Sequence, residues 1–260
     1  MSNKQLPIRD IVELCEFVLS RLSILGSEKE GTFSKEKLIF PKKIQANGTK
    51  MIERVSEQEF RLLFIEGFKK KFDDLHYSIE TPTMNKYSFS KSPENIIPDT
   101  EHGRSASIDM CIHKWNFYPD YKYNRVLNIE FKHKNASIEK IGKDILKLVH
   151  EGVDGAFIFL LDNTDSGSLS KMGSTDGLFS KIFKSFTLFK QHWNDSKENA
   201  EKKCIQLIIA SLRQKTIIYR NICKKDLNNL AHIFYQNIDC GDITEITRER
   251  GWRSVSKKTN

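Results

Sequence analysis

The sequence predicts an α/β protein built on a mixed β-sheet that is flanked by helices. Hydrophobic residues recur at helical spacing up to residue 72, and with a period of two between residues 75 and 134. Helical spacing then returns and is followed by a short apolar run. The hydrophobic fraction of 38% and the charged fraction of 29% are typical of a globular chain. Helices and strands that alternate in this way favour a mixed sheet with helices on its faces.

Two amphipathic helices are expected before the first strand. Residues 8–25 place apolar side chains at helical spacing, and residues 26–50 are Lys-rich and predict a linker with a short helix around Lys35–Ile39. Ser56 and Glu59 form a capping box that begins the second helix. The buried stripe of this helix consists of Phe60, Leu63, Phe64, Gly67, Phe68 and Phe72.

The central part of the chain predicts strands, one helix and a further strand. A first strand at His76–Glu80 is expected to pair with Lys86–Ser90, and a proline-containing loop follows. The next elements are strands at Ser105–His113 and Arg125–Lys134, a helix over residues 138–149, and a buried strand at Gly155–Leu161.

The last third of the chain predicts a loop, two helices and a pair of strands. Its elements are a mobile loop at 163–177, a helix at Leu178–Trp193, strands at Cys204–Leu212 and Thr216–Asn221, and a helix at Lys225–Tyr235. We therefore expect one domain over residues 56–245. An N-terminal helix and linker (1–55) precede it, and a frayed basic tail (246–260) follows it.

Charge and cysteine usage restrict the class of protein. The net charge of +8 favours an acidic partner such as nucleic acid, although a Lys-rich surface explains it equally well. The five cysteines are odd in number and form no CxxC pair, which argues against a disulfide framework and a zinc site. With no apolar run long enough for a bilayer, we expect a soluble cytoplasmic protein without a membrane partner.

Three polar residues on two predicted strands form the candidate site. The period of two places Glu130 and Lys132 on one face of their strand, with Phe131 on the other. If the strands are neighbours, Asp109 and Glu130 converge on one divalent cation, and hard oxygen ligands suit Mg²⁺ or Mn²⁺. Such a metal activates water for phosphodiester hydrolysis, and a lysine beside it stabilises negative charge.

The same short patterns occur elsewhere in the chain, so the predicted structure around each match decides which one is the candidate site. Asp120-Tyr-Lys122 and Glu201-Lys-Lys203 also match E/D-x-K, but both lie in polar surroundings. Pro98-Asp99 is a literal PD pair in a predicted loop. Only Glu130-Phe-Lys132 ends an apolar strand pattern. Taken singly, each residue is explained by a surface ion pair; their joint arrangement favours a functional site.

The order of elements and the triplet resemble the PD-(D/E)xK nuclease superfamily over residues 56–162. The resemblance implies a restriction-endonuclease-like core of α-β-β-β-α-β order, with helical N-terminal and α/β C-terminal additions. It also implies Asp109 and Glu130 as metal ligands, the Phe131 carbonyl as a third, and Lys132 as the catalytic lysine. Ile108 stands where the family pattern has proline, which weakens the match slightly.

A glutamate on the first core helix serves as an outer metal ligand in many members of this superfamily. Glu57 shares a helix side with Phe60, whereas Glu59 is explained by the capping box; both could also be simple caps. Asn128 and Lys134 share the strand face of Glu130 and are candidates for nucleic-acid contacts. Asp144 and Lys147 form an i,i+3 pair that we expect at the surface.

The sequence thus predicts a Mg²⁺- or Mn²⁺-dependent nuclease. The resemblance implies double-stranded DNA as substrate and a role as an endonuclease in restriction or phage defence, with a partner subunit or a homodimer matching the two-fold symmetry of a duplex. The alternative is an inactive nucleic-acid-binding or protein-interaction module of the same fold. No P-loop, GxGxxG, HExxH or GxSxG motif supports other enzyme classes.

Overall fold

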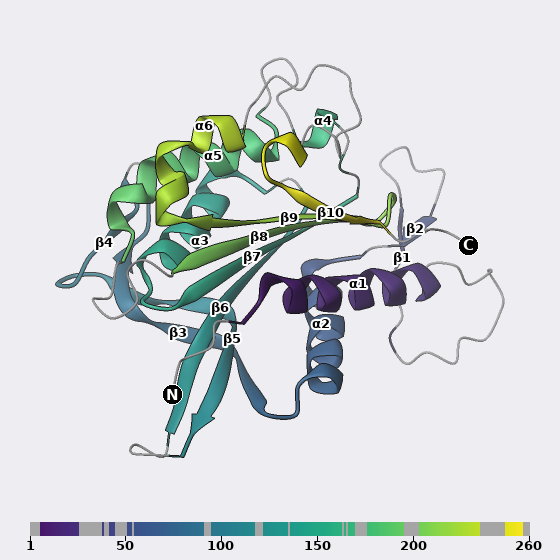
Figure 1. The fold of residues 1–260 in the computed structure, drawn as a ribbon, viewed down its shortest axis with the longest axis horizontal. Coiled ribbons are helices and arrows are strands. Elements are labelled where there is room, and N and C mark those ends of the chain that lie inside the picture. Colours follow the sequence, from purple (N-terminus) through teal and green to yellow (C-terminus); the bar gives the residue numbers. More distant parts are fainter. Residues whose placement is uncertain are drawn as a thin grey trace.

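Eight strands form one mixed sheet in the order β10-β9-β8-β7-β6-β5-β3-β4 (Figure 1). The computed structural model describes residues 6–25, 38, 42–44, 51–53, 55–90, 95–117, 122–134, 136–162, 164, 166–169, 176–194, 203–234 and 248–256. Its strands are β3 (Leu75–Ser88), β4 (Ile97–Pro98), β5 (Arg104–Asn116), β6 (Lys122–His133), β7 (Asp154–Leu161), β8 (Cys204–Ser211), β9 (Thr216–Cys223) and β10 (Arg253–Ser256). Strands β1 (Lys42–Ile44) and β2 (Met51–Glu53) form a separate pair.

Strands β6, β7 and β8 are parallel, and all other neighbours in the large sheet are antiparallel. Parallel neighbours need a crossover, and helices supply it. Helix α3 (Ile138–His150) joins β6 to β7, and α5 (Leu178–Phe189) lies in the connection from β7 to β8. The predicted α/β class with a central mixed sheet flanked by helices is therefore confirmed.

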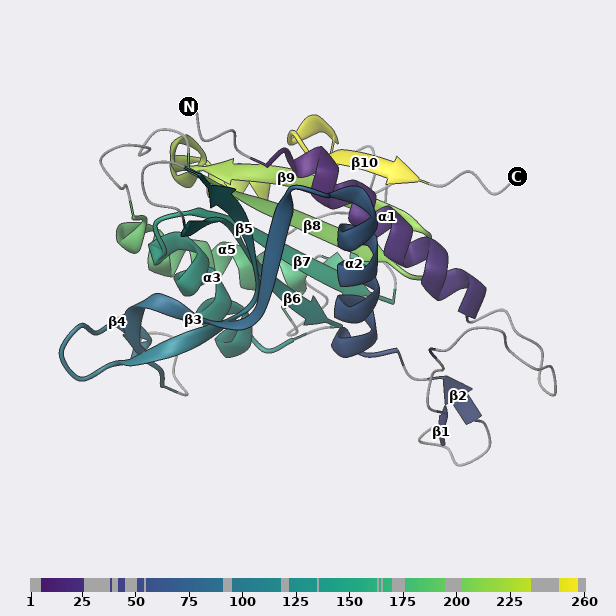
Figure 2. The ribbon, with the colours of Figure 1, turned by 90° about the horizontal axis from the view of Figure 1, so that it is seen from below.

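Helices cover both faces of the sheet (Figures 1 and 2). Helices α1 (Ile8–Leu25) and α2 (Glu57–Lys71) pack on one face, and α3, α5 and α6 (Leu230–Ile233) pack on the other. Each face has its own hydrophobic core: Phe131 and Ile158 belong to the first, Phe157 and Phe159 to the second. Successive residues of β7 therefore point to opposite cores.

Helix α2 is fixed by its cap, by α1 and by β6. The predicted capping box is present, with Ser56 N donating to Glu59 Oε2 over 2.8 Å. A Cβ atom at Gly67 would lie 2.8 Å from Phe17 Cδ1, so glycine is needed where α1 crosses α2. The rings of Phe60 and Phe64 lie edge-on to Phe131 at 5.7 and 5.3 Å between centroids. This packing holds the start of α2 against β6.

The predicted pairing of His76–Glu80 with Lys86–Ser90 is wrong, because both segments belong to the single strand β3. Each part pairs instead with β5, and the register shifts between Pro82 and Lys86. Four groups of the shifted segment bond to the Glu151 carboxylate: Met84 N, Asn85 N, Asn85 Nδ2 and Tyr87 Oη, at 3.0 to 3.1 Å. A buried glutamate distant in sequence therefore holds what looks locally like a turn.

The C-terminal third matches its predicted strands and first helix, with corrections at the end of the chain. Residues 190–192 continue α5 as the 3₁₀ turn η2 (Lys190–His192), and the helix expected at Lys225–Tyr235 is the 3₁₀ helix η3 (Lys224–Asn228) followed by α6. The tail is not frayed over residues 253–256, since β10 pairs with β9 and Trp252 is buried. The expected loop at 163–177 contains the short helix α4 (Ser166–Leu169). The helix expected around Lys35–Ile39 lies outside the described residues, except for Leu38.

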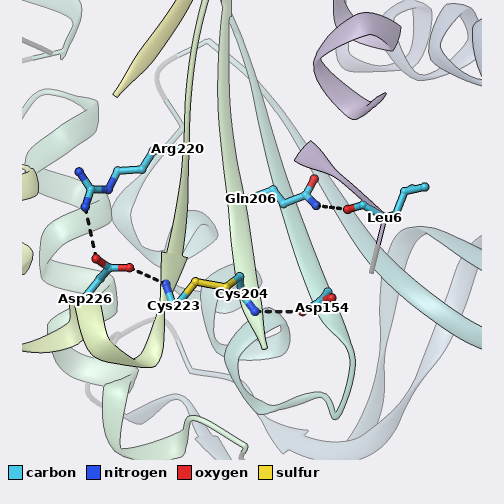
Figure 3. Close-up of a disulfide and its surroundings, with 7 residues drawn as sticks. All are labelled: Leu6, Asp154, Cys204, Gln206, Arg220, Cys223 and Asp226. Carbon is cyan, nitrogen blue, oxygen red and sulfur yellow. Dashed lines mark hydrogen bonds and ion pairs between the residues drawn. A yellow bond between two sulfur atoms is a disulfide. The ribbon is translucent and has the colours of Figure 1, made fainter. Parts of the chain in front are cut away.

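A disulfide joins Cys204 to Cys223, which corrects the expectation drawn from the cysteine count (Figure 3). The two residues are direct partners in the β8–β9 register, with Cα atoms 4.3 Å apart. Asp154 accepts a hydrogen bond from Cys204 N, and Asp226 accepts one from Cys223 N (Figure 3). The cysteines therefore no longer argue for a reducing compartment.

In the part of the chain that the structure describes, no helix combines the length and apolar character needed to cross a membrane.

Candidate active site

Asp109 of β5 is tied to β6 by its side chain. Its Oδ2 accepts a hydrogen bond from Phe131 N over 2.8 Å. The β5–β6 register pairs Met110 with Ile129, so Asp109 and Glu130 lie on adjacent strands at nearly the same level. The side chain of Asp109 is 18% exposed, which keeps it accessible from solvent.

Glu130 and Lys132 point to the face opposite Phe131, as the period of two predicts. Glu130 is fully buried, whereas the Lys132 side chain is 15% exposed. The Lys132 ammonium donates to the Phe131 carbonyl over 3.0 Å and pairs with Asp144 Oδ2 at 2.6 Å. The Phe131 carbonyl, which is the predicted third metal ligand, therefore accepts a hydrogen bond from Lys132, the predicted catalytic lysine.

Helix α3 adds two residues that were expected at the surface, and that expectation is wrong. Asp144 and Lys147 are both buried beneath the sheet face. The Lys147 ammonium lies 2.5 Å from Glu130 Oε1, 2.9 Å from Asp144 Oδ1 and 2.8 Å from the Ser107 carbonyl oxygen. A signal was available in the sequence, because Asp144 follows Ile141 by three residues and precedes Leu148 by four on the apolar side of α3.

Burial and neighbouring carboxylates shift the titration of the acidic residues. Burial raises the pKa of Glu130 well above its usual value, and the charges of Asp144 and Asp109 raise it further, against Lys147. Burial lowers the pKa of Lys132, but Asp144, Glu130 and Glu57 together raise it above its usual value. Burial and the neighbouring carboxylates thus both disfavour the charged form of Glu130.

Glu57, the first residue of α2, faces this group of charges. Burial raises its pKa, Lys132 lowers it, and Asp109 and Asp144 raise it. Glu59 instead bonds to Ser56 in the capping box. Of the two glutamates considered from the sequence, Glu57 is therefore the one in electrostatic contact with the site.

Arg61 and Glu80 also line the site, and the sequence reasoning missed both. Arg61 lies 2.6 Å from Glu80 Oε1 and 3.6 Å from Asp109 Oδ1, and it donates to Gln58 Oε1 over 2.7 Å. Glu80 lies opposite Asp109 in the β3–β5 ladder, has φ of +47°, and accepts a bond from Ser107 Oγ over 2.7 Å. A non-glycine residue in this left-handed region is strained, and such strain clusters at functional sites. Arg61 follows Glu57 by one helical turn, which was a usable signal.

The remaining candidates lie away from this cluster. Asn128 is fully buried and accepts a bond from Cys111 Sγ at 3.2 Å, so its predicted contact with nucleic acid is wrong for this structure. Lys134 is exposed at the end of β6 and lies 3.6 Å from Asp162. Asp99, in the literal PD pair, accepts bonds from Glu101 N and His102 N in a turn.

The donor set suits a hard divalent cation chemically. Glu57, Asp109 and Glu130 supply carboxylate oxygens. Burial raises the pKa of Glu57 and of Glu130, neighbouring carboxylates raise both further, and a bound cation would offset that negative charge. Across the described ranges, however, no three histidine, cysteine, aspartate or glutamate side chains converge as ready metal ligands. In this structure the carboxylates of Glu130 and Asp144 pair instead with the ammonium groups of Lys147 and Lys132.

Comparison of the chain with family models, with curated proteins and with solved structures gave no match.

Proposed function

We propose that the chain is a metal-dependent nuclease with a restriction-endonuclease-like core. The observation that carries the proposal is the meeting of Asp109 from β5 with Glu130 and Lys132 from β6 in one partly buried, charge-rich site. The element order α2, β3, β5, β6, α3, β7 is consistent with the α-β-β-β-α-β order of that core. Burying these charged groups costs desolvation energy, and buried groups with shifted pKa values are concentrated at functional sites. A functional role is therefore favoured over a simple ion pair.

The proposed ligands are Asp109, Glu130 and the Phe131 carbonyl, with Glu57 as an outer ligand. A divalent cation bound there would supply an activated water and offset charge on the phosphoryl oxygens. Asp109 is already oriented by the Phe131 amide, so little freedom remains to be lost on binding. Lys132 is oriented by the Phe131 carbonyl and by Asp144, and its remaining N–H is available to a phosphate.

The proposed substrate is nucleic acid, with double-stranded DNA preferred. The net charge of +8 favours a polyanion. The Arg61 guanidinium lies 3.6 Å from Asp109 and 2.6 Å from Glu80, and a cation bound at Asp109 would weaken its pairing there. Released from them, Arg61 is suited to contact a phosphate. A two-fold dimer or a partner subunit would allow both strands of a duplex to be cut.

A second function is favoured by one specific observation. Lysine ammonium groups hold Glu130 and Asp144, and a site balanced in this way is also what a non-catalytic nucleic-acid-binding module would retain. In that case the same residues stabilise the sheet and the basic surface binds the ligand. The two functions differ in whether phosphodiester bonds are broken.

Cleavage assays separate the two functions. Purified protein is incubated with plasmid, linear duplex DNA, single-stranded DNA and RNA, in Mg²⁺, Mn²⁺ or EDTA. We expect cleavage with either metal, none in EDTA, and loss in Asp109→Ala and Lys132→Ala. Asp99→Asn is the matched control, since it changes the other PD aspartate, in a turn. Cleavage that survives EDTA or both alanine variants contradicts the nuclease; metal-independent binding without cleavage supports the binding module.

A further inference from the structure

Asp144 lies between two lysine ammonium groups. Its Oδ2 is 2.6 Å from Lys132 Nζ, and its Oδ1 is 2.9 Å from Lys147 Nζ. Asp144 is 6% exposed, so neither pair is weakened by solvent as a surface ion pair is. Together with Glu130, these residues form a buried chain of alternating charge: Glu130, Lys147, Asp144, Lys132.

The two lysines differ in how many oxygen atoms lie close to their ammonium groups. An ammonium group has three donors. Lys147 meets three oxygen acceptors, on Glu130, Asp144 and Ser107, and its side chain is 9% exposed. Within the described residues the Lys132 ammonium lies close to two, on Asp144 and Phe131, and its side chain is 15% exposed. Lys132 has fewer oxygen atoms around its ammonium group and the more exposed side chain, so of the two lysines it is the one that can reach a substrate.

We infer that Asp144 is a positioning residue that fixes the Lys132 ammonium for the reaction, while Lys147 is the internal counter-ion of Glu130. This inference rests on the proposed nuclease function. Asp144 acts through Lys132 and not on the substrate, because an ammonium group lies within ion-pair distance of each of its oxygens, at 2.6 and 2.9 Å. A metal ligand would need at least one of these oxygens to turn to the cation.

The assignment also explains why the site contains two lysines. If Lys147 were absent, Lys132 would be the nearest cation for both Glu130 and Asp144, and its ammonium would be drawn inward. With Lys147 paired with Glu130, Lys132 stays at the Phe131 carbonyl, where it also interacts electrostatically with Glu57.

A double-mutant cycle tests whether Asp144 acts through Lys132. With Mg²⁺ and duplex DNA, Asp144→Asn should lower kcat about 100-fold, the cost of misplacing a catalytic group by about 1 Å. KM should be unchanged. In a Lys132→Gln background the same change should have no further effect, because the group that it positions is already gone. A further fall of kcat in that background means a general structural role and overturns the inference.

Metal binding provides a readout that does not depend on turnover. Mn²⁺ affinity, measured by electron paramagnetic resonance, should be unchanged in Asp144→Asn and reduced in Glu130→Gln. Equal loss of affinity in both variants makes Asp144 a ligand and overturns the inference. Asp176→Asn is the matched control: it alters an aspartate 2.5 Å from Lys184 beside α5, and it should leave kcat and Mn²⁺ affinity unchanged.

Unfolding measurements separate failure of the inference from failure of the proposed function. If the wild-type protein cleaves no substrate, the nuclease proposal fails, and urea unfolding of the same four proteins decides whether Asp144 and Lys132 are coupled. Additive effects on stability overturn the positioning of Lys132, and coupled effects support it. If Asp144→Asn does not fold, Asp144→Glu enters the cycle, since it keeps the charge and displaces the lysine.

Discussion

Replacing Lys147 with methionine should expose how much the site depends on its internal cation. The substitution removes the ammonium from Glu130, Asp144 and the Ser107 carbonyl while keeping most of the side-chain volume. Asp144 keeps its contact with Lys132, whereas Glu130, which is 1% exposed, loses the ammonium group that lies 2.5 Å from it. Breaking a buried pair on one side costs about 3–5 kcal/mol, and we expect that loss in the free energy of unfolding.

The loss should depend on pH and on divalent cations. Burial already raises the pKa of Glu130, and without Lys147 it should rise further, so the carboxylate is protonated as the pH falls. The destabilisation should therefore be largest at neutral and higher pH and shrink on acidification. A cation that binds Glu130 only in the folded state restores about 2.7 kcal/mol at about 100 times its Kd.

Urea unfolding at several pH values, in EDTA and in excess Mg²⁺, measures these effects. The double variant Glu130→Gln, Lys147→Met should be much less destabilised than Lys147→Met alone, since no unpaired charge remains. The reasoning is refuted if Lys147→Met costs less than about 1 kcal/mol in EDTA, below the range for a broken buried pair. It is also refuted if Mg²⁺ stabilises the variant no more than it stabilises the double variant.

Three further predictions concern the scaffold. Glu151→Gln should lower the free energy of unfolding by about 3 kcal/mol in urea, because the buried carboxylate bonds to the backbone of β3; a loss below about 0.5 kcal/mol contradicts its role. Burial lowers the pKa of Lys203 to about 7, so the unfolded chain binds more protons between pH 7 and about 10.4 and stability should rise with pH there. Lys203→Met should remove that slope in thermal unfolding; an identical slope in both proteins contradicts the assignment. Serine at both Cys204 and Cys223, 19 residues apart, should cost about 3 kcal/mol, and a reductant should then have no further effect; free thiols in the wild type would contradict the disulfide.

Local patterns were sufficient to predict most of the elements. The period of two identified β5, β6 and the shared face of Glu130 and Lys132, because alternation is a property of a single strand. The capping box at Ser56 was equally local. The pairing of β3 could not be predicted locally, since Pro82 to Lys86 resembles a turn. The distant Glu151 holds this segment within one strand.

Other parts of the site depend on register and packing. The position of Glu80 opposite Asp109 follows from the β3–β5 ladder, which no residue of β3 specifies alone. The spacing of Asp144 and Lys147 favoured a surface ion pair, although the place of Asp144 between Ile141 and Leu148 on the helix indicates burial. Similarly, Cys223 lies two residues beyond the predicted end of its strand at Asn221, and its position opposite Cys204 follows from the β8–β9 register.

The most direct test of the central claim is the rate of plasmid cleavage as a function of Mg²⁺ concentration, in the wild-type protein and in Asp109→Asn. The account predicts cleavage that saturates with Mg²⁺ in the wild type and is absent in the variant, which loses a ligand charge but keeps a side-chain oxygen beside the Phe131 amide. Equal cleavage by both proteins, or none by the wild type at any Mg²⁺ concentration while it still binds DNA, would contradict the claim.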